Sequence, residues 1–256
     1  MPYLSNDGVL RGSYLPDKAM PADFQDKIVL VTGTAGDIGR GVSDLFREEG
    51  ARVFETDVRS QDQSGFTAGD VSDHAFVRQW VSSVLDETGR IDVLINNAGI
   101  CPRTPMPEVT PEEWDEVIGV NMTGTFFLSQ AVIKHMVGRQ SGAIISLASL
   151  AGQVGGIAAG VHYSATKAAI VCITKTLARF GAAHGVRANA VAPGVIDTAM
   201  NEAVTDEQIE QFRKTIPLGR LGTVAEVIEP ILFLASDRAS YITGATLDIN
   251  GGIIMN

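Results

Sequence analysis

Cysteines and long apolar segments are scarce in this sequence. Its two cysteines, Cys101 and Cys172, have no second cysteine or histidine at the short spacings typical of metal sites. We therefore expect neither a metal centre nor a disulfide framework, and interpret both thiols as small buried side chains. No apolar run approaches the roughly 18 residues of a membrane span, and the N-terminus lacks the basic flank and apolar core of a secretory signal. These absences predict a cytoplasmic protein without a membrane partner.

Positive charge is also in short supply. The 256 residues include 20 lysines and arginines against 30 aspartates and glutamates, which gives a formal net charge of -10. Nucleic acid and anionic membranes would both repel such a chain, so neither is an expected partner. The hydrophobic fraction of 45% is sufficient, at this length, for one domain with a substantial core.

Short apolar runs alternate with helical patterns from residue 26 to the end of the chain. Residues 1–25 are rich in turn-forming residues and predict an N-terminal arm, followed by a catalytic domain at residues 26–256. Buried strands are expected at residues 27–32, 52–56, 65–68, 91–95, 143–147, 186–191 and 245–249. Helices are expected at residues 40–49, 75–88, 111–137, 163–183 and 224–236.

Two connections depart from this regular pattern. The second and third strands are too close in sequence for a helical crossover, so a single turn is expected between them. Residues 198–218 are irregular and are interpreted as a substrate lid with short helices. The overall alternation predicts an α/β fold, a doubly wound parallel sheet in a single domain.

A glycine-rich loop joins the first strand to the first helix. Gly33, Gly36 and Gly39 allow the backbone to approach a phosphate, and the helix that follows offers N–H groups and positive potential. The loop therefore predicts a dinucleotide-binding site.

An acidic residue, Asp57, ends the second strand 18 residues after Gly39. A carboxylate at this position accepts hydrogen bonds from the hydroxyls of an adenosine ribose and repels a 2′-phosphate. Because no lysine or arginine lies in residues 34–37, we expect NAD rather than NADP. Arg59, two residues further on, is the one neighbour that favours NADP.

Three polar residues follow the strand at residues 143–147. Ser149 lies at its carboxyl end, where ligands bind in open α/β sheets. Tyr163 and Lys167 are four residues apart on a predicted helix and so share one face. Ser146 is an alternative to Ser149, and His162 is expected to have a surface or packing role because it points about 100° away from Tyr163.

The motifs TGTAGDIG, NNAG, Ser149, YSATK and PGVIDT, read in this order, resemble the short-chain dehydrogenase/reductase family over about residues 24–251. The resemblance implies a Rossmann-like domain of about seven parallel strands, a nicotinamide cofactor and a homotetramer. It implies a Ser-Tyr-Lys-Asn catalytic set, which corresponds to Ser149, Tyr163, Lys167 and Asn121.

The predicted cofactor site combines the glycine loop, Asp57 and the family motifs. The loop contributes Gly33, Gly36, Asp37, Ile38 and Gly39. To these the resemblance adds Asp70, Val71, Asn97, Ala98, Gly99, Tyr163, Lys167, Pro193, Gly194, Ile196 and Thr198.

Two features depart from the family pattern. Asp37 stands where the family usually has glycine, and is expected either to cap the helix or to bring an unfavourable charge to the pyrophosphate. One extra residue separates Ser149 from Tyr163, within the loop that forms part of the substrate pocket. The other pocket walls are expected at residues 100–103 and 200–218.

The expected chemistry is hydride transfer with Tyr163 as acid or base. A tyrosine has an ordinary pKa of about 10, which the charge of Lys167 is expected to lower. Ser149 is expected to bind the substrate oxygen, and the resemblance implies that Asn121 holds a water linking Lys167 to solvent.

Three functional hypotheses follow. The leading one is an NAD-dependent dehydrogenase or ketoreductase that interconverts a secondary alcohol, such as a polyol, cyclic alcohol or sugar derivative, and its ketone. The second is an NADPH-dependent 3-oxoacyl thioester reductase, which Asp57 disfavours. The third is a nucleotide-sensing protein without turnover, which the complete Ser, Tyr and Lys set disfavours.

Overall fold

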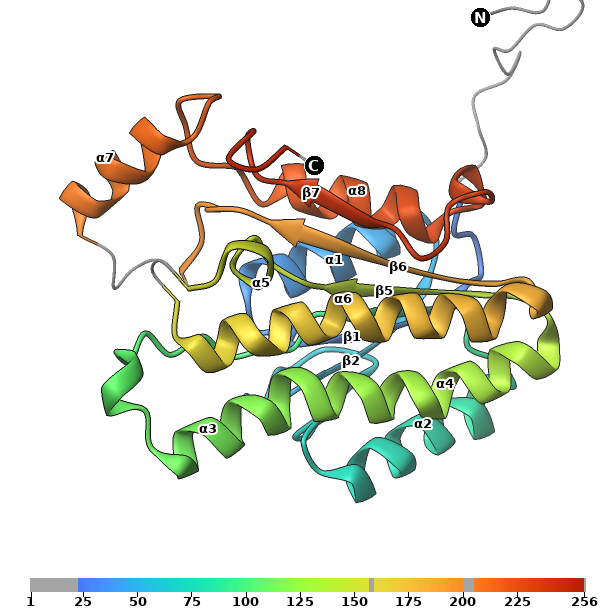
Figure 1. The fold of residues 1–256 in the computed structure, drawn as a ribbon. Helices are drawn as coiled ribbons and strands as arrows, with labels where there is room; N and C mark the ends of the chain where they lie inside the picture. Colours follow the sequence, from blue (N-terminus) through green and yellow to red (C-terminus); the bar gives the residue numbers. More distant parts are fainter. Residues whose placement is uncertain (1–22, 157–158, 200–204, 256) are drawn as a thin grey trace, which may run out of the picture.

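A parallel sheet of seven strands forms the centre of the computed structural model, which describes residues 23–156, 159–199 and 205–255 (Figure 1). The strand order is β3-β2-β1-β4-β5-β6-β7, so the winding reverses between β1 and β4. The strands are β1 (Ile28–Thr32), β2 (Arg52–Asp57), β3 (Phe66–Ala68), β4 (Val93–Asn96), β5 (Gly142–Leu147), β6 (Val186–Pro193) and β7 (Thr246–Ile249). The predicted doubly wound parallel sheet is confirmed.

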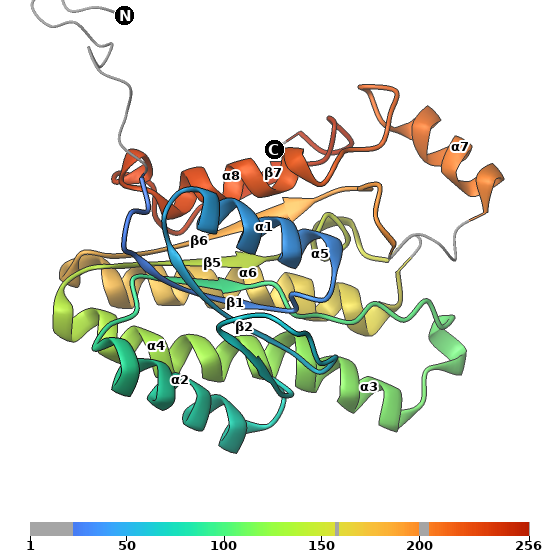
Figure 2. The same cartoon turned by 180° about the vertical axis from the view of Figure 1, so that it is seen from behind.

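Helices cover both faces of the sheet (Figures 1 and 2). On one face lie α1 (Asp37–Glu48) and α8 (Ala225–Ala235), and on the other lie α2 (His74–Thr88), α4 (Thr125–Arg139) and α6 (Val161–Gly181). Each face has its own apolar core, with Phe46 and Ile231 in the first and Trp80 and Leu128 in the second. Because both faces are covered, every residue of β1 is buried, which explains its unbroken apolar sequence.

Three short helices, α3 (Pro111–Val117), α5 (Ala151–Val154) and α7 (Asp206–Thr215), lie at the end of the sheet toward which the strands point (Figure 1). The predicted lid at residues 198–218 includes α7, whereas its residues 200–204 lie outside the described part of the chain. The same holds for residues 1–22 of the predicted N-terminal arm.

The predicted elements match the observed ones to within a few residues, with one difference of kind. The helix expected at residues 111–137 consists of α3, a π-helical segment (Ile118–Gly124) and α4, in direct succession. The connection between β2 and β3 contains turns and no helix, as predicted. No helix within residues 23–156, 159–199 and 205–255 is long and apolar enough to cross a membrane.

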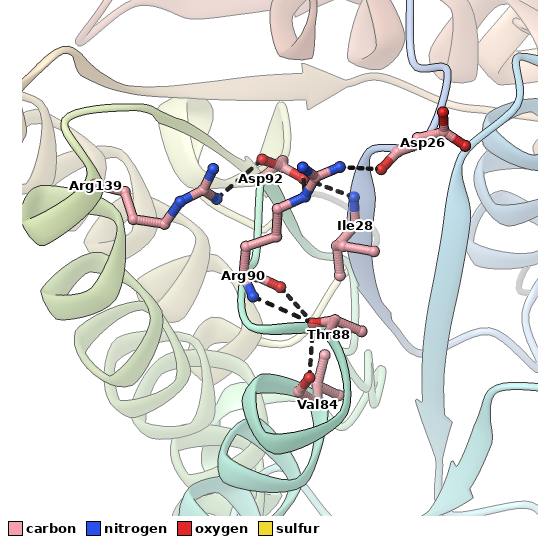
Figure 3. A network of polar contacts seen from close by, with 7 residues as sticks. All are labelled: Asp26, Ile28, Val84, Thr88, Arg90, Asp92 and Arg139. Atoms are coloured by element: carbon pink, nitrogen blue, oxygen red, sulfur yellow. Dashed lines mark hydrogen bonds and ion pairs between the residues drawn. The ribbon is translucent and has the colours of Figure 1, made fainter.

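A polar network joins β1 and β4 at their amino-terminal ends (Figure 3). The buried carboxylate of Asp92 accepts hydrogen bonds from the Ile28 N–H at 2.8 Å and from Arg139 at 3.1 Å, and Arg90 Nε lies 3.1 Å away. Arg90 also donates to the Asp26 carbonyl. One carboxylate thus aligns the starts of β1 and β4, at the end of the sheet opposite the carboxyl ends of the strands.

We expect Asp92→Ala to destabilise the protein by about 2–4 kcal/mol, because it leaves a buried N–H without its acceptor and removes the carboxylate that pairs with two arginines. Urea unfolding measures the change. Glu87→Ala is the control, since Glu87 forms an exposed ion pair with Arg52 and its loss should cost less than about 1 kcal/mol. Equal effects of the two substitutions would contradict this role for Asp92.

Candidate functional site

The glycine loop lies between β1 and α1, at the carboxyl end of the sheet. Gly33 has a φ of +72°, and a Cβ there would lie 2.7 Å from Ala98 Cα. A Cβ at Gly39 would lie 2.3 Å from the Gly33 carbonyl oxygen. These two glycines are required by the packing of the loop itself, whereas a Cβ at Gly36 would meet only the Gly33 oxygen, at 3.6 Å.

The first turn of α1 offers a binding site for an anion. Gly36 is the N-cap residue, and no side chain in the described residues caps this helix end. The N–H groups of the first turn, which includes Asp37 and Ile38, therefore remain available to a pyrophosphate. The loop fits a dinucleotide cofactor on this ground.

Asp37 does not cap α1. Its exposed carboxylate accepts a hydrogen bond from the Ala199 N–H at 2.8 Å, in the segment that follows β6. This contact engages the extra charge of the glycine loop with a backbone donor from the other side of the predicted cofactor site. The structure thus shows a third outcome that neither sequence-based alternative described.

Asp57 is buried at the end of β2 and faces the glycine loop. Its carboxylate accepts hydrogen bonds from the Ala35 N–H at 3.0 Å and the Arg59 N–H at 2.9 Å. Arg59 Nε lies 3.5 Å from the same carboxylate, although the arginine side chain is 67% exposed. The negative charge is thereby held beside the loop, with Arg59 engaged by it.

A threonine hydroxyl ties the end of β4 to the glycine loop. Thr32 Oγ1 accepts the N–H groups of Asn97 at 3.1 Å and Ala98 at 3.0 Å. The Asn97 amide donates back to the carbonyls of Thr32 at 2.9 Å and Gly33 at 3.0 Å. Asn97 and Ala98 therefore fix the position of the glycine loop. Thr32 is a structural partner that was not predicted from the sequence.

Asp70 and Val71 follow β3. Asp70 is exposed and accepts the Ser72 N–H at 2.8 Å. Val71 is buried against the π-helical segment, where a Cβ at Gly124 would lie only 2.8 Å from its carbonyl oxygen. This close approach brings the end of β3 next to the helix that carries Asn121.

The segment after β6 crosses the same end of the sheet. The Pro193 carbonyl accepts the Leu150 N–H at 2.9 Å, and the Gly194 N–H donates to Ile249 at 2.9 Å. Ile196 is buried and pairs with Gly222. The hydroxyl of Thr198 donates to the Ile196 carbonyl at 3.4 Å. The segment is thus fixed to both β5 and β7.

Ser149, rather than Ser146, reaches Tyr163. The Ser149 hydroxyl accepts the Ala151 N–H at 3.1 Å and hydrogen-bonds to the Tyr163 side chain. Ser146 is buried in β5, where its hydroxyl accepts a hydrogen bond from the Asn96 amide at 3.1 Å. Of these two serines, Ser149 is therefore the one that lies beside Tyr163.

Lys167 lies under the tyrosine ring in a buried position. Its Nζ is 5.5 Å from the centroid of the Tyr163 ring and donates to the Leu147 carbonyl at 2.6 Å. Burial lowers the pKa of Lys167 to about 8, and interaction with Cys101 partly offsets this.

The pKa of Tyr163 is raised above its ordinary value. Burial of the phenol is the main cause and Cys101 adds to it, while the hydrogen bond with Ser149 acts in the opposite direction. The sequence predicted a lowering by Lys167. The difference arises because the ammonium is engaged by the Leu147 carbonyl and burial dominates.

Asn121 lies in the π-helical segment and joins a loop to α6. Its fully buried amide accepts the Ile100 N–H at 2.8 Å and donates to the Ile100 carbonyl at 2.9 Å and to Thr166 Oγ1 at 3.2 Å. A Cβ on Gly99 would lie 3.3 Å from Asn121 Oδ1 and 3.6 Å from Lys167 Nζ. The amide and the ammonium thus converge on Gly99, and a π-helical turn at such a position is typical of functional sites.

Cys101 lies in the segment expected to form a pocket wall, but its position beside Tyr163 and Lys167 was not predicted. The thiol is half-buried and lies close enough to Tyr163 and Lys167 to influence the pKa of both. Its pKa is raised by burial, against the effect of Arg103 and Lys167. Its position two residues after Gly99, beyond a strand end, was the available signal. Cys172 is exposed on α6, so its interpretation as a buried side chain is wrong.

A cavity of about 420 Å³ is separate from these residues. It lies between the segment that follows α7 and the end of the chain, and its described lining includes Ile196, Leu218, Asn250 and Met255 but none of the four predicted catalytic residues. Within the described residues no group of three or more His, Cys, Asp or Glu side chains is placed to hold a metal ion.

Comparison with known proteins identifies the family. A family model described as enoyl-(acyl carrier protein) reductase matches residues 33–254. The 3-oxoacyl-(acyl-carrier-protein) reductase of Thermotoga maritima is 36% identical over 245 residues, which cover 91% of this chain and 99% of that protein. The enzyme of the same name from Escherichia coli is 36% identical over 244 residues, with the same coverage.

A solved structure is similar over most of its length. The ligand-free aldohexose dehydrogenase of Thermoplasma acidophilum is 30% identical, with a TM-score of 0.83 and coverage of 91% of this chain and 95% of that one.

These relatives overturn the leading functional hypothesis. A dehydrogenase of a polyol, cyclic alcohol or sugar derivative is the wrong assignment, because relatives that match over 99% of their length are named as 3-oxoacyl reductases. They favour the second hypothesis. The motifs misled because they specify hydride transfer and not the substrate.

The family model spans most of the chain, and the relatives match over almost their whole length. The chain is therefore an oxidoreductase that belongs to the short-chain dehydrogenase/reductase family, whose members bind a nicotinamide cofactor.

Proposed function

We propose that this protein reduces the 3-oxo group of an acyl thioester to a 3-hydroxy group, with NADH as the electron donor. The observation that carries the proposal is the 36% identity to 3-oxoacyl-(acyl-carrier-protein) reductases over 91% of this chain. The family model is described as an enoyl reductase, which acts on a carbon–carbon double bond. We favour the ketone because full-length relatives are more informative than a description shared by a broad family.

Tyr163 is the proposed proton donor, and Ser149 hydrogen-bonds to its hydroxyl. Reduction of a ketone requires a proton on the carbonyl oxygen, so the donor must stay protonated at neutral pH. Burial raises the pKa of Tyr163 and thereby keeps it protonated. When bound, the nicotinamide supplies the hydride to the carbonyl carbon.

Lys167 and Asn121 support the acid in this scheme. At neutral pH Lys167 is charged, since its pKa is about 8, and its ammonium stabilises negative charge on the phenol oxygen after proton transfer. The Asn121 amide lies near the same ammonium, at Gly99, and holds the loop that follows β4. In this proposal, a proton from solvent returns to Tyr163 past Lys167 and Asn121.

The preference for NADH rests on Asp57. Its carboxylate is fixed at the loop by the Ala35 and Arg59 N–H groups, where it can accept ribose hydroxyls and would repel a 2′-phosphate. Arg59 is the available cation, but it forms an ion pair with Asp57.

We expect Asp57→Asn to raise the ratio of kcat/KM for NADPH to that for NADH by about 10-fold or more, because the amide keeps an acceptor and loses the charge. Steady-state rates with each cofactor measure the ratio. Asp62→Asn is the matched control, since it removes an equal charge from the connection that follows Asp57. A wild-type preference for NADPH would overturn the cofactor assignment and leave the reaction proposal intact.

The reaction is tested with acetoacetyl-CoA, by following the loss of NADH absorbance and identifying 3-hydroxybutyryl-CoA by mass spectrometry. Crotonyl-CoA is the control for enoyl reduction. Turnover of crotonyl-CoA but not acetoacetyl-CoA would replace the proposed reaction with enoyl reduction. Tight NADH binding without turnover of either compound would favour the nucleotide-sensing alternative. The cytoplasmic location and the homotetramer remain predictions from the sequence.

A further inference from the structure

The loop from Ile100 to Thr104 is held against the start of α6 at three points. Ile100 is bound through both of its backbone groups to Asn121, which also bonds to Thr166. The Pro102 carbonyl accepts the Gly160 N–H at 3.0 Å. The third point involves Thr104 and is formed by side chains alone. Between these points the loop presents Cys101 to Tyr163 and Lys167.

Glu113 on α3 forms the third connection. One of its carboxylate oxygens accepts the Thr104 hydroxyl at 3.0 Å, and the other lies 2.7 Å from His162 Nε2. Both hydrogen bonds lower the pKa of Glu113, so the carboxylate stays charged at neutral pH. One side chain thus joins the loop to the residue that immediately precedes Tyr163.

His162 is packed in the interior, as one of the two expected roles required, and it makes a polar contact as well. The residue is fully buried, and its ring stacks on Trp114 with the centroids 6.5 Å apart. Its Nδ1 has no hydrogen-bond partner among the described residues, so the contact with Glu113 is the polar interaction that compensates burial of the ring. A carboxylate beside Nε2 also places the ring proton on that nitrogen.

We propose that Thr104, Glu113 and His162 form a clasp that positions the Cys101 loop and Tyr163 for the reaction. Glu113 and His162 are positioning residues in this arrangement: they hold the wall of the substrate pocket against the first turn of α6, and they make no contact with the reacting atoms. Opening the clasp lets the loop move away from Tyr163, which weakens substrate binding and exposes the Cys101 thiol. The kinetic part of this inference rests on the proposed reaction, whereas the thiol part does not.

The test measures the accessibility of Cys101 in a Cys172→Ser background, which leaves Cys101 as the single thiol of the chain. Alkylation by iodoacetamide is followed by intact mass. We expect Glu113→Ala to increase the alkylation rate and the KM for acetoacetyl-CoA by about 10-fold each, with the Kd for NADH unchanged. Glu113→Gln, which can still bond to both partners, should restore most of the wild-type behaviour.

Glu112→Ala is the matched control, because Glu112 is exposed on the same turn of α3. If Glu113→Ala does not fold, Thr104→Val replaces it, since this change removes one hydroxyl of the clasp with little change of shape. Alkylation rates and KM values of either variant equal to those of Glu112→Ala would overturn the proposal. If the wild-type protein does not reduce acetoacetyl-CoA, the reaction proposal fails while the alkylation rates still test the clasp.

Discussion

The Tyr163→Phe variant is expected to lose about 10³-fold in turnover and to bind NADH as the wild type does. The substitution removes the proton donor and its hydrogen bond with Ser149, and leaves the ring that covers Lys167 in place. Single-turnover rates with acetoacetyl-CoA measure the loss, and a fluorescence titration measures cofactor affinity.

Tyr241→Phe is the matched control for this experiment. Tyr241 is fully exposed, so loss of its hydroxyl should change neither turnover nor affinity. If Tyr163→Phe retained more than about a tenth of the wild-type rate, proton donation would have to come from another group. Loss of NADH binding together with turnover would instead indicate that the hydroxyl is needed for the cofactor.

A second large effect is expected from Lys167→Met, which should abolish efficient turnover and at the same time stabilise the cofactor-free protein at pH 7 by about 1–2 kcal/mol. Lys167 is only 4% exposed, and burial has lowered its pKa from 10.5 to about 8. Keeping this group charged costs stability at neutral pH. Loss of the hydrogen bond to the Leu147 carbonyl offsets part of the gain.

The stability of the wild type relative to Lys167→Met should depend on pH. Between pH 8 and 10.5 the unfolded chain holds a proton on Lys167 that the folded protein has released, so the stability of the wild type rises with pH across this range. The difference between Lys167→Met and the wild type should therefore shrink from pH 7 to pH 10 in urea unfolding. Lys175→Met, on the exposed face of α6, should show no such trend. A variant less stable than the wild type at pH 7 would contradict the expected penalty.

The sequence by itself determined the fold and the main parts of the predicted site. Buried parallel strands produce unbroken apolar runs such as Ile28–Thr32. The tight glycine loop requires Gly33 because of Ala98, and Gly39 because of the Gly33 carbonyl. Ser149 and Tyr163 were predicted in the same way, because strand ends and helical spacing are local patterns. These features depend on a few neighbouring residues and are therefore visible in the chain.

Contacts between distant segments were decided only by the tertiary structure. Asp37 and Ala199 are 162 residues apart, and Glu113 and His162 are 49 apart, so no local pattern announces either pair. The position of Cys101 beside Tyr163 depends on how one loop packs against one helix. The partner of Lys167 likewise depends on which carbonyl the fold places within reach. Such contacts arise when elements that are far apart in the chain meet in space, whereas the local patterns of the sequence report only which elements form.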